Sequence, residues 1–536
     1  MKVLQSIVLL LGVLLPATAA AYDFEVDGIY YSIFGNESAV TFGTKKYTGD
    51  LTIPEAVTHG GTTYPVTMIG VSAFDGCSDL TSVTMPNSVS TIAGYSFRNC
   101  KGLTSLNIPN SVTEIGQYAF FGCSGLTGEL VLPNSLTAIG IEVFGRCTGL
   151  TGELVIPNSV TSIGTGAFEY CHGLTGELVI PNSVTSIGFG AFSDCTGFTS
   201  VIIPNSVTTI RGQAFYCCSG LTSVTIPNSI NEIDYATFYY CTGLTSVTIP
   251  NSVTTIGDDA FFGCSGLTSI TIPNSVTTIG IYAFARCAGL TGEVVIPSSV
   301  TEISDGVFAW CNGLTNIIVE SGNPNYDSRD NCSAIIETSS NTLIAGCINT
   351  VIPNSVTGIG NAAFCGLSGL TGELVIPNSV TWIGEGAFSQ CTGLTSVTIP
   401  NSVTSIGYAA FYHYPNLKDI YCYIINLERV SVGYEIFYCN LEGVYSGRTL
   451  HVPHGTAEAY QADSHWYPYF GQIVDDLTPD HQPGDVNCDG EVNIADINAV
   501  IAAILSGTVN PDCDINIDGE VNIADINAVI SIIFAN

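Results

Sequence analysis

The stretch LTSVTIPNSVTTIGDDAFFGCSG, residues 244–266, decides the fold. It begins with alternating apolar and hydroxyl-bearing side chains, the pattern of a strand with one buried face. Pro250 ends this strand because proline lacks the N–H that a β-ladder needs. A second short extended piece with a glycine corner follows, and Ala260 and Phe261 are expected to begin a helical turn that places the phenylalanine in the core. The stretch therefore predicts one coil made of two short strands and a turn.

The same pattern recurs along the chain with a period of 23 or 24 residues. The longer form, LTGELVIPNSVTSIGTGAFEYCHG at residues 150–173, carries its extra residue in the Gly-Glu step before the strand. A fixed period of this size indicates a solenoid, because one coil cannot bury its apolar face without its neighbours. Fourteen equivalent phenylalanines run from Phe74 to Phe411. The coils begin at Leu80, Leu103, Leu126, Leu150, Leu174, Phe198, Leu221, Leu244, Leu267, Leu290, Leu314, Leu370, Leu394 and Leu417.

The repeated rung Ile-Pro-x-x-Val-x-x-Ile-Gly-x-x-Ala-Phe-x-x-Cys resembles the BspA-like branch of leucine-rich repeat proteins, over about residues 50–417. The resemblance implies a right-handed solenoid, mainly β with short helical turns. It also implies a protein that is secreted or held on a bacterial surface, that serves in adhesion and protein recognition, and that has no catalytic activity.

The series of coils is interrupted between Leu314 and Leu370. Within the extra residues, Ala334–Glu337 is expected to pair with Thr342–Ala345 across the turn TSSN. The insertion is either a decorated rung or a ligand-binding loop, since insertions in repeat proteins tend to map onto one face.

Cysteine is unusually regular in this chain, because twelve of the twenty cysteines recur at one rung position. Equivalent positions in a stack point in parallel directions, whereas a disulfide needs facing Cβ atoms. We therefore expect these side chains to be buried free thiols that act as small apolar groups. Cys332 with Cys347, Cys422 with Cys439, and Cys488 with Cys513 remain candidate bridges. The repeated cysteines are Cys77, Cys100, Cys123, Cys147, Cys171, Cys195, Cys218, Cys241, Cys264, Cys287, Cys311 and Cys391.

The chain is strongly acidic, with 12 Lys and Arg against 46 Asp and Glu and a formal charge of −34. This balance argues against a nucleic-acid partner and against attraction to anionic lipid. Divalent cations are the natural counter-charge, because carboxylate oxygens are their preferred ligands.

The C-terminus repeats one sixteen-residue phrase, DVNCDGEVNIADINAV from Asp485 and DINIDGEVNIADINAV from Asp514. Each copy has the EF-hand spacing, with oxygen ligands at positions one, three, five, seven and twelve and a glycine at six. An aspartate replaces the usual final glutamate. The sequence therefore predicts two Ca²⁺ ions, bound by Asp485, Asn487, Asp489, Glu491 and Asp496, and by Asp514, Asn516, Asp518, Glu520 and Asp525.

A helix with one apolar stripe is expected after each loop. Two such loop-helix units resemble the type I dockerin module, over residues 484–536, so that the second part of the fold is small, all-α and calcium-binding. The resemblance implies docking onto a cohesin domain of a scaffold, often in assemblies that break down plant polysaccharides. Docking residues implied at loop positions ten and eleven are Ile494, Ala495, Ile523 and Ala524. Because the two copies are nearly identical, docking in either of two orientations is possible.

The first 21 residues combine one lysine, an apolar run and small residues, which predicts a secretory signal peptide. The apolar run is shorter than the roughly 20 residues of a membrane span. No transmembrane segment is expected in the mature chain.

The predicted division of the chain is a signal peptide at 1–21, an N-terminal β cap at 22–64, repeats at 65–416 with an insertion at about 320–350, a C-terminal cap at 417–476, a linker at 477–483 and the dockerin at 484–536.

Other candidate sites are weaker. His451, His454 and His465 have a spacing that suggests zinc, although a loop that caps the solenoid is the favoured interpretation. Outward strand positions carry glutamates, and positions around the turn carry tyrosines that are either interface anchors or rim packing. The glutamates are Glu129, Glu153, Glu177, Glu293 and Glu373, and the tyrosines are Tyr95, Tyr118, Tyr170, Tyr239, Tyr282 and Tyr408.

The sequence as a whole predicts a secreted, non-catalytic binding protein. Its solenoid recognises a protein or glycan ligand, and its calcium-dependent tail docks onto a cohesin-like partner. Two alternatives remain open: a polysaccharide-degrading enzyme with an unrecognised active site, and a surface adhesin with a vestigial tail. No GxSxG nucleophile motif is present, and the acidic residues are repeat equivalents or loop ligands rather than an isolated pair.

Overall fold

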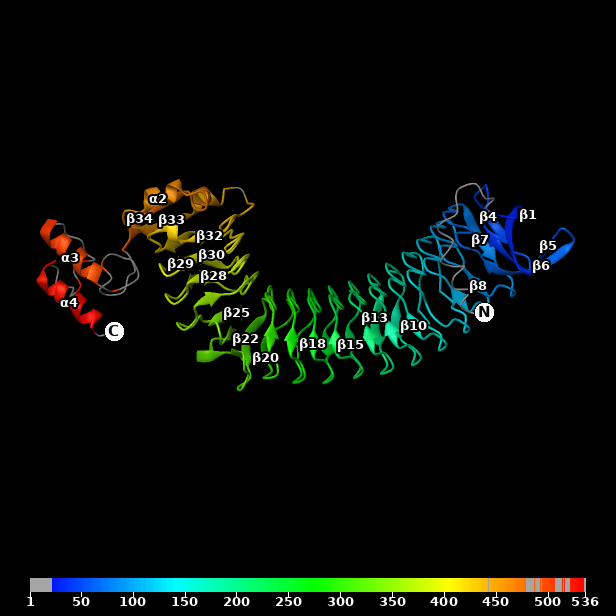
Figure 1. Ribbon diagram of the computed structural model, residues 1–536, viewed down its shortest axis with the longest axis horizontal. Coiled ribbons are helices and arrows are strands. Elements are labelled where there is room, and N and C mark those ends of the chain that lie inside the picture. Colours follow the sequence, from blue (N-terminus) through cyan, green and yellow to red (C-terminus); the bar gives the residue numbers. More distant parts are fainter. Residues whose placement is uncertain are drawn as a thin grey trace. The chain divides into compact units, whose positions relative to one another are not determined.

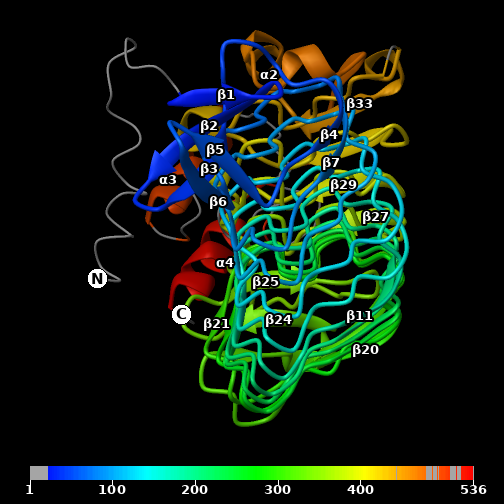
Figure 2. The same cartoon turned by 90° about the vertical axis from the view of Figure 1, so that its right-hand side faces the viewer.

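The computed structural model describes residues 22–441, 443–478, 486, 492, 494–506, 513, 515 and 521–534. The chain divides into two compact units, one comprising residues up to 253 with 264–266 and the other comprising 254–263 with the residues from 267 onward. In each unit, strands of successive coils lie side by side (Figure 1). The coils of one unit follow nearly the same closed path, one behind another (Figure 2). The fold is the predicted repeat solenoid, mainly β, followed by a small helical module.

In the first unit, a mixed sheet begins the stack and parallel ladders continue it. Strands β1, β2 and β3 are antiparallel, β3 pairs in parallel with β6, and β5 forms a hairpin with β6. The strands are β1 (Phe24–Val26), β2 (Ile29–Phe34), β3 (Glu37–Thr41), β4 (Gly49–Thr52), β5 (Ala56–His59), β6 (Thr62–Ile69), β7 (Leu80–Thr84), β8 (Thr91–Ile92), β9 (Glu114–Ile115), β10 (Ser162–Ile163), β11 (Gly176–Val179), β12 (Ser186–Ile187), β13 (Phe198–Ile202), β14 (Thr209–Ile210), β15 (Ser223–Thr225), β16 (Glu232–Ile233) and β17 (Ser246–Thr248).

The second unit continues with two ladders of its own. The longer strands pair in the orders β20-β22 and β27-β29-β31-β33-β34, and the two-residue strands include the series β26-β28-β30-β32. The strands are β18 (Thr255–Ile256), β19 (Thr278–Ile279), β20 (Gly292–Ile296), β21 (Glu302–Ile303), β22 (Leu314–Val319), β26 (Gly358–Ile359), β27 (Gly372–Val375), β28 (Trp382–Ile383), β29 (Leu394–Ile399), β30 (Ser405–Ile406), β31 (Asp419–Cys422), β32 (Ser431–Val432), β33 (Thr449–Pro453) and β34 (Gln472–Leu477).

The alternating pattern sets the two faces of the first strand. In β13, Phe198 and Val201 are buried whereas Thr199 and Ile202 are exposed. Parallel pairing keeps this register from coil to coil, so that Val201 lies beside Val224 of β15. The apolar positions therefore form continuous columns inside the coil, as the sequence predicts.

The third side of each coil is the segment after the second strand, which contains the repeated Ala-Phe pair. This segment differs from the expected short helical turn, because it consists of consecutive hydrogen-bonded turns. In the coil that contains Phe192, the backbone N–H groups alternate between two acceptors. Phe192 and Asp194 donate to carbonyls of the next coil, whereas Ser193 and Cys195 donate to carbonyls three residues earlier. A helix would use all of these donors internally. The ladder between coils therefore replaces the helix.

The phenylalanines of this third side stack through the core. Phe144, Phe168 and Phe192 are fully buried, and the ring centroids of Phe144 and Phe168 lie 5.6 Å apart with an interplanar angle of 11°. The second unit has stacked rings of its own, and Phe437 of its last coil lies 5.2 Å from Phe411. Stacked rings at this distance contribute both buried area and aromatic contact.

The repeated cysteines are free thiols, as predicted. Their side chains are buried, and every one of these thiols except that of Cys77 donates to the carbonyl of the core phenylalanine in the coil before it, at 3.1 Å for Cys195 and Phe168. Cys332, Cys347, Cys422 and Cys439 are also free, so neither of the two bridges among them forms. The third candidate bridge includes Cys488, which lies outside the described residues.

The insertion forms the predicted hairpin. β24 (Ala334–Glu337) pairs antiparallel with β25 (Thr342–Gly346), and β23 (Tyr326–Asp327) adds to its other edge. β25 then pairs in parallel with β26, so the hairpin belongs to the ladder of the second unit rather than lying on its surface. A short 3₁₀ helix, η1 (Arg329–Asn331), connects β23 to the hairpin.

The last coils close around large side chains. Trp466, Arg448 and Tyr460 are fully buried, and a guanidinium nitrogen of Arg448 donates to the carbonyl of Phe437 at 2.8 Å. Covering the end of the stack in this way hides apolar surface that a terminal coil would otherwise expose. The helices here are η2 (Leu427–Arg429), η3 (Tyr445–Gly447), α2 (Ala457–Ala462) and η4 (Tyr467–Tyr469).

The terminal module contains the two predicted helices, α3 (Ile494–Ser506) and α4 (Ile523–Ile533). Val500 and Val529 are fully buried in a small core of their own, together with Val486, Ala503 and Cys513. The apolar stripe of each helix therefore packs against the other copy of the repeat.

Candidate functional sites

Two of the ten predicted calcium ligands are among the described residues of the terminal module. Asp496 and Asp525, at position twelve of their loops, lie in the first turns of α3 and α4 and are fully buried. The other eight lie outside the described residues: Asp485, Asn487, Asp489, Glu491, Asp514, Asn516, Asp518 and Glu520.

Asp525 is held by the backbone at the start of α4. Its Oδ2 atom accepts a hydrogen bond from the backbone N–H of Asn522 at 2.8 Å, and Oδ1 of Asn522 accepts one from the N–H of Ala524 at 2.8 Å. This reciprocal arrangement is a capping box. It fixes the carboxylate in position at the end of the loop.

The burial of these two carboxylates fits a calcium site. A buried charge needs an opposite charge nearby, and the sequence contains no lysine or arginine after Arg448. Oxygen-rich loops of this spacing match the preference of Ca²⁺ for six to eight oxygen ligands. The residues present therefore suit a divalent cation as the counter-charge.

The four predicted docking residues lie at the start of the two helices. Ile494 is 73% exposed and Ile523 is 69% exposed, although both are large and apolar. Ala524 is exposed and Ala495 is half-buried. The two copies thus present equivalent apolar side chains beside the loops.

The strand face of the first unit is acidic and rich in hydroxyl groups. Glu129, Glu153 and Glu177 are exposed on successive coils, and Glu177 accepts a hydrogen bond from the hydroxyl of Ser200 at 3.1 Å. Glu293 of the second unit likewise accepts one from the amide of Asn316 at 2.9 Å. Glu177 and Glu293 are therefore held within the face by neighbouring polar side chains.

The third sides of successive coils form a surface that we call the turn face. It carries an arginine between two aromatic rings. The guanidinium carbon of Arg146 lies 4.8 Å from the ring centroid of Tyr170 and 5.8 Å from that of Phe121. Sequence analysis identified Tyr170 but missed Phe121 and Arg146. The sequence contained a signal that could have identified them, because the three residues occupy equivalent or adjacent rung positions on consecutive coils and stacking brings such positions together.

The three histidines of the zinc hypothesis pair with different carboxylates. His451 lies 2.8 Å from Asp476, whereas His454 and His465 pair with Asp475 and Asp463. In the part of the chain that the structure describes, no group of three or more His, Cys, Asp or Glu side chains is arranged to hold a metal ion. Each of these histidines therefore lies beside a different carboxylate.

The fold and the terminal module define a class: a repeat solenoid that carries a small module of two equivalent helices. Comparison with known families agrees. The BspA type leucine rich repeat region matches residues 62–175, 175–291, 282–343 and 336–451, and the dockerin type I domain matches residues 483–533. The chain belongs to the BspA-type leucine-rich repeat family and carries a dockerin type I domain at its C-terminal end.

Solved structures of bacterial leucine-rich repeat proteins are similar to the chain. A leucine rich cell surface protein from Faecalibacterium prausnitzii A2-165 is 26% identical, with a TM-score of 0.49, and the match covers 77% of this chain and 97% of that one. A leucine-rich repeat protein from Bacteroides ovatus ATCC 8483 is 25% identical, with a TM-score of 0.43, over 84% of this chain and 100% of that one. No curated protein matches the chain.

These families define the broad class of function. Leucine-rich repeats and dockerins are non-enzymatic kinds of domain, and dockerins of type I bind calcium and have cohesins as partners. Proteins with either domain are typically extracellular or associated with a surface. Among the described residues, none of the helices has the length and apolar character needed to cross a membrane.

Proposed function

We propose that the protein is a secreted binding protein whose solenoid recognises a protein or glycan ligand and whose dockerin attaches it to a cohesin domain on a scaffold or cell surface. The two equivalent helix starts, each with a buried aspartate beside an exposed isoleucine, are the observation that carries the proposal. In this arrangement the tail supplies attachment and the solenoid supplies recognition. Residues 1–21 act as the secretory signal, and 477–483 link the last coil to the tail.

Calcium has a structural role in this proposal. Each loop wraps one ion, so that two ions are bound, and Asp496 and Asp525 contribute the last side-chain ligands of the two loops. Without the ions, the nine acidic residues from Gly484 onward repel one another. Metal binding is therefore coupled to folding of the tail.

Cohesin contacts are made by Ile494, Ala495, Ile523 and Ala524. Exposed isoleucines are suitable anchors, because burying such a side chain at an interface stabilises a complex by about 1.5–3 kcal/mol. The two copies are nearly identical, so either helix can occupy the same place on the partner. This duplication supports docking in two orientations.

The biological setting that we propose is an assembly for polysaccharide breakdown. The solenoid brings a target to the scaffold, and enzymes on the same scaffold act on it. Direct assays of the purified protein on plant glycans test the alternative that it is itself an enzyme. Turnover of any glycan by this chain would contradict the proposal.

The docking proposal is tested with the full chain and a panel of purified cohesin domains. We expect capture by at least one cohesin in calcium and none in excess EGTA. The double substitution Ile494→Asp with Ile523→Asp should abolish capture, whereas each single substitution should leave most of it, because the other helix still docks. Capture that persists in EGTA, or that survives the double substitution, would overturn the docking proposal.

A further inference from the structure

Two of the few basic side chains of this acidic protein project into one open pocket of the first unit. The chain has only 12 lysines and arginines. Lys101 and Arg146 line the same pocket of about 420 Å³, and both side chains are exposed. Within the described part of the chain, the charged group of neither residue forms a hydrogen bond or an ion pair. By contrast, Arg98, on the same coil as Lys101, is paired with Asp75 at 2.7 Å.

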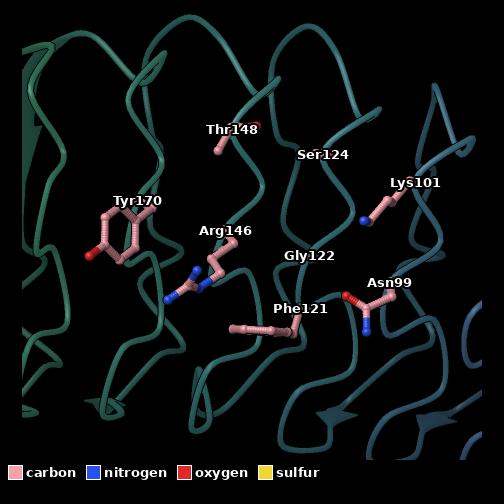
Figure 3. Close-up of a pocket in the computed structure, with 8 residues that line it drawn as sticks. All are labelled: Asn99, Lys101, Phe121, Gly122, Ser124, Arg146, Thr148 and Tyr170. Carbon is pink, nitrogen blue, oxygen red and sulfur yellow. The ribbon is translucent and has the colours of Figure 1, made fainter.

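The guanidinium carbon of Arg146 lies over the rings of Tyr170 and Phe121, so two aromatic neighbours stabilise its charge. This exposed guanidinium presents a planar fork of N–H donors, which suits bidentate binding of a carboxylate or sulfate. Figure 3 shows Lys101 and Asn99 directed towards the side of the pocket where Phe121 and Arg146 lie.

The remaining lining is polar. Asn99, Ser124 and Thr148 contribute amide and hydroxyl groups beside the two cations. Lys101 and Arg146 belong to coils two steps apart, a separation of about 10 Å if the coils are spaced as neighbouring strands are. Such spacing suits a chain with repeated anionic groups better than a single small anion.

Three backbone N–H groups of the residues that line the pocket already have acceptors in the neighbouring coil. The N–H groups of Asn99, Gly122 and Arg146 donate to carbonyls of the next coil at 2.7, 2.8 and 2.6 Å. A peptide strand therefore finds no free edge here to extend. A ligand must be recognised through charges, hydroxyl groups and ring edges, which is the chemistry of an acidic sugar.

The nearby carboxyl of Glu142 neutralises the positive charge of Arg146 only in part. Glu142 lies close enough to Arg146 for the arginine to lower its pKa, yet burial and the neighbouring Glu169 raise the pKa of Glu142 to about 7. Glu142 is therefore only partly ionised at neutral pH. Its neutralising effect on Arg146 is correspondingly reduced.

We propose that this pocket binds an acidic polysaccharide, in which Arg146 binds one carboxylate or sulfate group and Lys101 binds another. The inference deepens the proposed role of the solenoid in ligand recognition and rests on it. Docking of the tail is independent, since it uses residues after 484. The shared ligand chemistry is an anionic sugar, and the experiment distinguishes a carboxylate from a sulfate.

The second unit offers a matched control. The guanidinium carbon of Arg286 lies 4.7 Å from the ring centroid of Trp310 and 5.7 Å from that of Phe262, the equivalent arrangement on equivalent rung positions. Counted back along the sequence from Arg286, the rung position of Lys101 is occupied by Thr242, a residue of the first unit. The control thus keeps the stacked arginine and lacks the second cation.

The test measures binding of the full chain to polygalacturonate, dextran sulfate and neutral dextran by affinity electrophoresis. EGTA is present throughout, so that calcium cannot bridge the acidic tail to the polymer. We expect binding to one or both charged polymers and not to dextran. Arg146→Gln should weaken it at least tenfold and Lys101→Gln severalfold, whereas Arg286→Gln should leave it within twofold of the wild type.

Four outcomes overturn the inference. These are no binding to either charged polymer, binding unchanged by Arg146→Gln, an equal loss in Arg286→Gln, and tighter binding of polyglutamate than of either polysaccharide, which indicates an acidic peptide. Circular dichroism melts check that each variant folds. Calcium-dependent cohesin capture by Arg146→Gln separates failure of this pocket from failure of the docking proposal.

Discussion

Eleven of the twelve repeated cysteines donate to a defined backbone carbonyl, which explains why a thiol recurs at a position where another small apolar residue would also pack. Cys171 donates to the carbonyl of Phe144 at 3.2 Å, and burial raises the pKa of the Cys171 thiol to about 12. The neutral thiol is thus both a donor and a small apolar group. The carbonyl of Phe144 also accepts the backbone N–H of Cys147 at 3.2 Å, so the thiol is its second donor.

The burial of these thiols predicts their reactivity. At pH 8, iodoacetamide should modify half-buried Cys217 in the folded protein well before its fully buried neighbour Cys218. Burial raises the pKa of both thiols, but that of Cys218 more strongly, and the thiolate is the reactive form. Tandem mass spectrometry measures the two rates, because fragmentation between the adjacent cysteines shows which one is modified.

Unfolding in urea provides the control for this prediction, because both cysteines should then react at similar rates. Equal rates in the folded protein would contradict the buried position of Cys218.

Glu142 makes stability depend on pH. Its pKa is raised by burial first and by Glu169 second, to about 7 from an ordinary value of 4.5. A carboxyl whose pKa is raised on folding contributes stability that is fully present below pH 4.5 and is lost as the pH rises through 7. Glu142→Gln should therefore raise the urea midpoint at pH 8 and have little effect at pH 4.5.

The matched substitution is Glu153→Gln on the exposed strand face, which should change the midpoint little at either pH. If Glu142→Gln were as stable as the wild type at pH 8, or less stable, the buried carboxylate would not be a source of instability.

The turn segment is the element whose conformation the repeat depends on most. It uses two left-handed positions per coil, for example Gly190 with φ of 60° and Asp194 with φ of 57°. These positions turn the chain so that alternate N–H groups point to the next coil. Residues other than glycine hold this conformation at a cost of about 1–2 kcal/mol.

That cost predicts an unusual order of stability. At Gln213, with φ of 59°, Gln213→Gly should unfold at a higher urea concentration than Gln213→Ala. At Arg211, which is exposed and is not in the left-handed region, the order should reverse. Equilibrium unfolding of the four variants tests both statements. The same order at both sites would mean that backbone conformation does not control stability in the turn.

At the scale of the whole molecule, the tail and the repeats have separate cores. The core of the tail consists of residues between Val486 and Ile533, and the cluster around the last coils contains none of them. Removal of calcium should therefore unfold the tail alone. Far-UV circular dichroism of the full chain should lose the signal of α3 and α4 in EGTA and regain it when calcium is added.

The urea midpoint of the repeats, followed by tyrosine fluorescence, serves as the control and should be unchanged by EGTA. A shift in this midpoint would show that calcium also stabilises the solenoid. A tail that kept its helical signal in EGTA would contradict the coupling of calcium binding to folding.

Much of this protein follows from the sequence alone. The period of 23 or 24 residues and the alternation in each first strand are local patterns, and local patterns determine which face of a strand is buried. The hairpin of the insertion and the helices after the two loops were predicted for the same reason. The spacing of the calcium loops is also local, because consecutive residues of one segment surround one ion.

Tertiary structure alone decided the features that depend on neighbouring coils. The third side becomes a ladder of turns because Phe192 and Asp194 find their acceptors one coil away, outside the reach of any local pattern. The pocket of Lys101 and Arg146 likewise joins side chains from coils that the sequence separates by 45 residues. Stacking brings such residues together in space, and the direction of each side chain depends on left-handed backbone positions that local residue preferences do not favour.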